Sequence, residues 1–170
     1  MTILDAVKER RSVRDFLPRE IPAAIIETLK EALIWAPSAG NLQARKFYFL
    51  FSKKIKEKLA AAALNQHFIA QAPLVIVACT DSTIHAHYGQ RGVHLYTIQD
   101  VAVSLMGMML VVHEAGLGSV WVGAFHEEEV SHILHLPHNL RPVAIVPVGY
   151  PASIPIAPPR VSKDHAIIEK

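Results

Sequence analysis

Residues 74–79 read Leu-Val-Ile-Val-Ala-Cys, an uninterrupted apolar run in the middle of the chain. Such a run predicts a strand that is covered on both faces, because a half-exposed strand alternates apolar and polar side chains. The fold must therefore place structure on both sides of a sheet. The chain has 170 residues, of which 51% are hydrophobic and 19% charged, so it suits one domain over residues 1–170 and argues against disorder.

Local patterns predict the other elements. Thr2 caps a first helix that runs to about Arg10, and a second helix begins near Pro22 and ends at Pro37. The strands are expected at residues 46–51, 74–79, 119–125 and 143–148, and further helices at 53–64, 95–115 and from 127 onward. This alternation alone would predict a wound parallel sheet, although no G-x-G-x-x-G motif follows any strand.

Several classes of protein are disfavoured. The formal net charge of +2 is too small to indicate a nucleic-acid partner. The N-terminus lacks a signal-peptide pattern, and the longest apolar run falls short of the ~20 residues that span a bilayer. The single cysteine, Cys79, lies in the apolar strand, where a buried, inert thiol is expected. These features predict a cytoplasmic protein without a membrane partner.

Three segments carry residues suited to ligand binding. Residues 10–16 (R-R-S-V-R-D-F) offer guanidinium groups and a hydroxyl for a phosphate. Residues 36–43 (A-P-S-A-G-N-L-Q) offer neutral donors on a turn, and residues 116–125 (G-L-G-S-V-W-V-G-A-F) include Gly123, beside which a flat ring can approach the backbone. Arg160, after two prolines, is a further candidate for the phosphate.

Each segment has an ordinary structural explanation by itself. Basic residues suit the C-terminus of a helix, a polar turn joins a helix to a strand, and a tryptophan suits a buried strand. Taken together, they can hold a phosphate and hydrogen-bond the polar edge of a flat heterocycle. Flavin mononucleotide (FMN) has both parts, so the combination predicts a flavin enzyme.

The ten histidines offer a competing signal. His85, His87 and His94 lie close in sequence, and His132, His135 and His138 recur at every third position. However, Pro137 interrupts the second set, and no acid or second cysteine completes either one. We therefore expect solvated or locally hydrogen-bonded histidines and no metal site.

The ordered set of segments resembles the FMN-dependent nitroreductase family. Besides the segments above, it includes Q-A-P-L-V-I-V at residues 71–77, Y-T-I-Q-D at 96–100, P-V-A-I-V-P-V-G-Y-P at 142–151 and P-P-R at 158–160. The resemblance covers nearly the whole chain. It implies an α+β three-layer sandwich, with a mainly antiparallel sheet flanked by helices and an extended C-terminal arm.

The resemblance also implies a homodimer with FMN at the subunit interface and NADH or NADPH as co-substrate. The implied flavin contacts are Arg10, Arg11, Ser12, Arg14, Gln66 (or its neighbour Asn65), Trp121, Val122, Gly123, Ala124 and Arg160 from one subunit, and Pro37, Ser38, Ala39, Asn41 and Gln43 from the other. No catalytic acid or base is implied, since the cofactor carries the chemistry.

The leading functional hypothesis is an NAD(P)H-dependent FMN oxidoreductase that reduces a nitro compound, quinone or similar acceptor by a ping-pong mechanism. A second hypothesis keeps the fold but changes the reaction to dehalogenation, flavin cleavage or dehydrogenation. A third is a non-catalytic protein that binds a flavin or a polyanion through residues 10–16.

Overall fold

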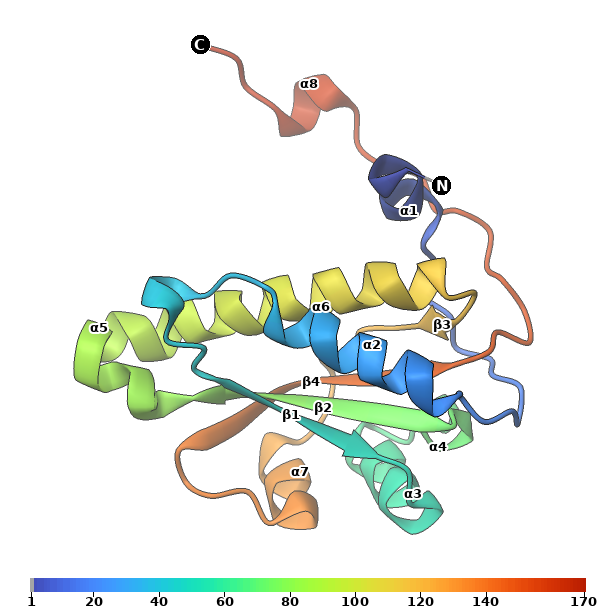
Figure 1. Cartoon of the computed structure of the whole chain (residues 1–170), viewed down its shortest axis with the longest axis horizontal. Helices are drawn as coiled ribbons and strands as arrows, with labels where there is room; N and C mark the ends of the chain where they lie inside the picture. The colour runs from blue at the N-terminus through green and yellow to red at the C-terminus, as the bar shows by residue number, and fades with distance from the viewer. Residues whose placement is uncertain (1) are drawn as a thin grey trace.

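The computed structural model describes residues 2–170, and over this range it forms one four-stranded sheet (Figure 1). The strands are β1 (Arg45–Leu50), β2 (Leu74–Asp81), β3 (Gly118–Ser119) and β4 (Leu140–Gly149), in the order β1-β2-β4-β3. All three neighbouring pairs are antiparallel. The parallel sheet expected from alternation alone is therefore wrong, and the antiparallel sheet implied by the resemblance is confirmed.

Helices cover both faces of this sheet. On one face lie α2 (Ala23–Ile34) and α6 (Thr97–Glu114), and on the other lie α3 (Lys53–Ala62), α4 (Phe68–Gln71) and α7 (Glu127–Leu134) (Figure 1). All eight residues of β2 are buried, and the side chains of residues 74–79 alternate between two apolar clusters. The three-layer α+β sandwich is thus confirmed, and the apolar run of β2 is its middle layer.

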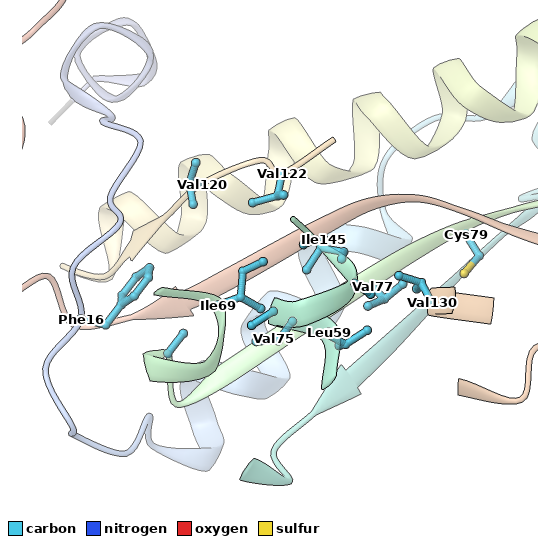
Figure 2. Close-up of a cluster of buried hydrophobic side chains, with 14 of the residues drawn as sticks. Phe16, Leu59, Ile69, Val75, Val77, Cys79, Val120, Val122, Val130 and Ile145 are labelled. Carbon is cyan, nitrogen blue, oxygen red and sulfur yellow. The ribbon is translucent and has the colours of Figure 1, made fainter. Parts of the chain in front are cut away.

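The cluster beneath the sheet is shown in Figure 2. Leu59 of α3, Ile69 of α4 and Val130 of α7 are fully buried against Val75 and Val77 of β2. The opposite cluster joins β2 and β4 to α2 and α6. Because the two clusters share the same strands, the sheet fixes both helical layers relative to each other.

Cys79 points into the cluster of Figure 2 and is fully buried. Burial raises the pKa of its thiol to about 12, so the reactive thiolate is strongly disfavoured at neutral pH. The expectation of an inert core cysteine is confirmed.

The long helix α6 continues a helical path that begins earlier in the chain. It follows η2 (Ser82–Ile84), α5 (His85–Arg91) and the π-helix η3 (Gly92–Tyr96), with non-helical backbone angles at Gly89. The path 82–114 is long and apolar enough, by length and composition, to cross a membrane, since an 18-residue window within it has a mean hydropathy of 1.7. In this structure, α6 packs one face against the sheet and leaves Val103 and Met106 exposed on the other.

The two ends of the chain stand away from the sandwich (Figure 1). Helix α1 (Ile3–Glu9) begins with the expected cap, since the Thr2 side chain accepts from the Asp5 N–H and the Asp5 carboxylate accepts from the Thr2 N–H. After β4, the proline-rich arm extends past α1, carries the short helix α8 (Lys163–Ala166), and is exposed from residue 152 to the end.

The strand predicted over residues 119–125 is largely wrong. Only Gly118–Ser119 pair continuously with β4, and a single bridge joins Val122 to Ile145. Both pairings share one register, which places Val120 opposite Pro147. Proline has no N–H to donate, so the ladder is interrupted there.

Candidate functional site

The basic segment, residues 10–16, runs along β3 at the edge of the sheet. Arg10 closes α1, and Ser12 then forms a parallel bridge with Ser119, where the Val13 N–H donates to the Ser119 carbonyl at 3.0 Å. Val13 is packed so closely against Gly118 that a Cβ there would lie 2.6 Å from a Val13 methyl group. The segment is therefore anchored to β3 and not free to move independently.

The start of the arm is fixed to the same segment. The Ala152 N–H donates to the Asp15 carbonyl at 2.9 Å, and Phe16 forms a bridge with Pro151. Further along, the arm and residues 10–14 line a common cavity of about 210 Å³. This cavity is lined by Arg10, Arg11, Ser12, Arg14, Pro155, Ile156, Pro158 and Arg160.

The cavity concentrates positive charge. Within residues 2–170, none of its four arginines forms an ion pair with a carboxylate. Arg11, Arg14 and Arg160 donate only to nearby backbone carbonyls. Burial, and then the charges of Arg160 and Arg11, lower the pKa of Arg10. Clustered guanidinium groups without a counter-ion are the donor set that a phosphate dianion requires.

The segment after Ser119 continues along this side of the molecule. Val122 is buried, whereas Trp121, Gly123 and Ala124 are exposed. A Cβ at Gly123 would meet only the Trp121 indole nitrogen, at 3.8 Å, so packing inside the chain does not require glycine here. The space over Gly123 is open to a flat ligand.

Gln66 lies beside Ala124. Its side-chain amide donates to the Ala124 carbonyl at 3.1 Å and to the Ala63 carbonyl at 2.9 Å. The two residues before it, Leu64 and Asn65, both have positive φ angles, and Asn65 is exposed. One chain therefore brings together Gln66, residues 119–124, the basic segment and Arg160.

The turn at residues 37–43 lies elsewhere. It contains η1 (Ala39–Asn41), and its Ala39 N–H donates to the Asp100 carboxylate at 2.9 Å, near the start of α6. Gly40 packs against the Tyr88 hydroxyl group. Pro37, Asn41 and Gln43 are exposed, while Ser38 and Ala39 are half-buried.

Helix α6 separates the two groups. The basic segment lines a cavity with Met109, Val112 and His113, at the C-terminal end of the helix. Asp100 and His113 are thirteen positions apart in α6, which is about 20 Å along a helix axis. In Figure 1, the turn that follows α2 and the region of β3 accordingly lie at opposite ends of α6. A single chain does not bring the turn to the arginine cavity.

Two residues at the turn were not anticipated. Asp100 holds Ala39, and Arg45 donates to the carbonyls of Ala36 and Pro37. An acid within an apolar helix and an arginine at the start of an aromatic strand were visible in the sequence, but neither pattern identifies a partner. The histidines give no comparable cluster: within residues 2–170, no three His, Cys, Asp or Glu side chains gather as they would around a metal ion.

Comparison with known proteins places this fold. The family model described as "Nitroreductase family" matches residues 7–93 and 60–150. A Methanothermobacter thermautotrophicus protein, provisionally named an NADH dehydrogenase/NAD(P)H nitroreductase, is 28% identical over 174 residues, covering 100% of this chain and 88% of its own length. An FMN reductase (NADPH) of Bacillus subtilis is 24% identical, covering 94% and 70%.

Solved structures agree with these sequence relatives. The structure of B. megaterium NfrA2 has a TM-score of 0.92 at 25% identity, over 100% of this chain and 75% of that one. Since the family model matches most of the chain and the layers superpose over its whole length, the chain belongs to the nitroreductase family.

Proposed function

We propose that this protein is an FMN-dependent oxidoreductase that uses NADH or NADPH to reduce a nitro compound, quinone or similar acceptor. The observation that carries the proposal is the arginine cavity, where four guanidinium groups and Ser12 face one space without a carboxylate partner. Relatives named as an FMN reductase and an NAD(P)H nitroreductase support this choice of ligand and electron donor.

The residues present fit FMN at both of its ends. Arg10, Arg11, Arg14 and Arg160 would neutralise and hydrogen-bond the phosphate, and Ser12 adds a hydroxyl donor. The open backbone at Gly123 admits the ring, with Trp121, Val122 and Ala124 beside it. When bound, FMN would supply the redox chemistry, namely hydride transfer from the nicotinamide through N5 and delivery of electrons to the acceptor.

In this scheme, the chain's own residues position the flavin ring and shield it. The hydrogen bond from the Gln66 side chain to the Ala124 carbonyl fixes the segment beside the ring. Asn65, which precedes Gln66 and is exposed, is free to contact the polar edge of the ring. Nicotinamide and acceptor would occupy the same open space over Gly123 in turn, which is a ping-pong order. No side chain needs to act as a catalytic acid or base.

A homodimer completes the site in this proposal. A two-fold axis across the exposed face of α6 would bring the turn of one copy, with Pro37, Ser38, Ala39, Asn41 and Gln43, to the arginine cavity of the other. Apolar side chains exposed on α1, α6 and the arm support such an interface: Ile3 is 80% exposed, Met106 37% and Ile156 95%. If light scattering showed a monodisperse monomer that still retained FMN, this dimer would be excluded.

The absorption spectrum of the purified protein, titrated with each nicotinamide, tests the proposed reaction. We expect a yellow protein that NADH or NADPH bleaches and that a nitro compound or quinone restores. A yellow protein that ignores both nicotinamides would instead favour dehalogenation, flavin cleavage, dehydrogenation or a carrier role. A colourless protein that cannot be reconstituted with FMN would refute the proposal.

A further inference from the structure

Helix α6 contains one buried acidic side chain, Asp100, which forms no ion pair within residues 2–170. Asp100 is only 6% exposed, and its Oδ1 atom accepts the Ala39 N–H at 2.9 Å. Its Oδ2 atom is buried and has no hydrogen-bond partner within the described residues. Burying a carboxylate is costly, so a core leucine or alanine would serve the packing of α6 better.

A buried cation lies at the entry to the same turn. Arg45 is 5% exposed, and its guanidinium donates to the Ala36 carbonyl at 2.6 Å and to the Pro37 carbonyl at 2.9 Å. Burial lowers the pKa of Arg45, and the charge of Asp100 opposes that effect. Arg45 therefore fixes where the turn leaves α2, and Asp100 fixes its middle.

The turn needs such support because its backbone is strained. Gly40, Asn41 and Gln43 have φ angles of 55°, 56° and 53°. Left-handed conformations are unfavourable for non-glycine residues such as Asn41 and Gln43, and persist only where the surroundings impose them. Inside the turn, the Asn41 N–H donates to the Ser38 carbonyl and the Gln43 N–H to the Ser38 hydroxyl, each at 3.0 Å.

We infer that Asp100 and Arg45 are positioning residues, which hold residues 38–43 in the conformation that receives the flavin ring. The inference rests on the proposed function and deepens it. Neither residue contacts the cofactor in this scheme; Asp100 acts through the Ala39 N–H, and Arg45 through the carbonyls before the turn. In the proposed dimer, Asp100 and Arg45 of one copy therefore affect the flavin whose phosphate is bound by the second copy.

The test compares Asp100→Ala and Asp100→Asn with wild type in the intact protein. Three quantities are measured: the FMN dissociation constant, the hydrogen-exchange rates of the amides of residues 38–43 without FMN, and the thermal midpoint. Asp100→Ala is expected to weaken FMN binding by about tenfold and to speed exchange in the turn, because Ala39 loses a charged acceptor. Asp100→Asn retains an acceptor oxygen and should recover most of the affinity, to within about threefold of wild type.

Ser104→Ala is the matched control. Ser104 is fully buried one helical turn further along α6, and its hydroxyl donates to the Asp100 carbonyl and makes no hydrogen bond to the turn within the described residues. Its loss should lower the thermal midpoint without changing exchange at residues 38–43 or FMN affinity. Arg45→Lys, which keeps the charge but loses the planar fork, provides a second positioning variant and should also speed exchange in the turn.

The outcomes separate this inference from the proposed function. If Asp100→Ala and Arg45→Lys lower only the thermal midpoint, while turn exchange and FMN affinity match wild type, the positioning role is refuted. If wild type itself binds no FMN, the proposed function fails, yet the exchange rates still decide whether Asp100 and Arg45 hold the turn.

Discussion

Arginine side chains have opposite roles at the two ends of α6. At the N-terminal end, Arg45 is buried, and its donors are consumed by carbonyls at the end of α2 and the start of the turn. At the C-terminal end, Arg10, Arg11, Arg14 and Arg160 surround an open cavity, and no carboxylate within residues 2–170 pairs with them. A satisfied arginine stabilises the fold, whereas a cluster of unpaired arginines is available to a ligand.

The largest effect should come from removing the satisfied arginine. Arg45→Met leaves the partly buried carbonyls of Ala36 and Pro37 without their donor, so we expect the free energy of unfolding to fall by on the order of 3 kcal/mol. Urea unfolding of the protein without FMN measures this. Arg160→Met is the control, since Arg160 is exposed and should leave the unfolding midpoint unchanged. Equal losses of unfolding free energy in both variants would contradict the contrast between the two ends of α6.

The unpaired arginines should affect binding in place of stability. Arg10→Ala or Arg160→Ala is expected to weaken FMN retention at least tenfold, because each loses phosphate hydrogen bonds worth about 1.5–3 kcal/mol. Flavin fluorescence titration gives the dissociation constants. Unchanged affinity in both variants would show that the phosphate is held elsewhere.

Riboflavin, which lacks the phosphate, sharpens this contrast. Arg160→Ala should lower affinity for FMN while leaving riboflavin affinity unchanged, since only FMN carries the phosphate group. Asn41→Ala at the turn should weaken both ligands by the same factor, about threefold to tenfold, because it removes one neutral hydrogen bond. If Asn41→Ala affected FMN alone, the turn would have to contact the phosphate and the assignment of the two ends would be reversed.

Glycines at the two ends should differ in the same sense, with smaller effects. Gly40 has a positive φ angle and its missing Cβ would collide with the Tyr88 hydroxyl, so Gly40→Ala should cost about 1–2 kcal/mol of stability. Gly123 has no such neighbour, and Gly123→Ala should change stability by less than about 0.5 kcal/mol. Its added methyl group should nevertheless weaken flavin binding. Thermal unfolding and fluorescence titration of both variants decide this.

Sequence patterns predicted the layers well because burial dominates them. The apolar run of β2 requires two covered faces, and all of its residues are buried as expected; Leu29 and Leu33 of α2 are buried on one of these faces. Strand direction did not follow from the same patterns, since alternating helices and strands are compatible with either sheet. The interruption near Val120 depends on Pro147, a residue far away in sequence whose register could not be foreseen.

The site was predictable only as separate pieces. Arginine-rich and glycine-containing segments indicate a phosphate and a flat ring, and the structure brings Arg10, Ser12 and Arg160 to one cavity. The support of the turn was missed, because the bond between Ala39 and Asp100 joins residues 61 positions apart. In a sequence, side chains that support a binding segment appear only as isolated charged residues within apolar elements until their partners are known.

Hybrid dimers test most directly whether two copies share each flavin. Arg10→Ala/Arg160→Ala would be co-expressed with Ser38→Ala/Asn41→Ala under two different affinity tags, and dimers carrying both tags would be purified. If the cavity and the turn of one site come from different copies, each hybrid has one intact site and one doubly defective site, so FMN binding should return to half of the wild-type level. If both segments of a site came from the same copy, every site in the hybrid would be defective, and the absence of recovery would contradict the account.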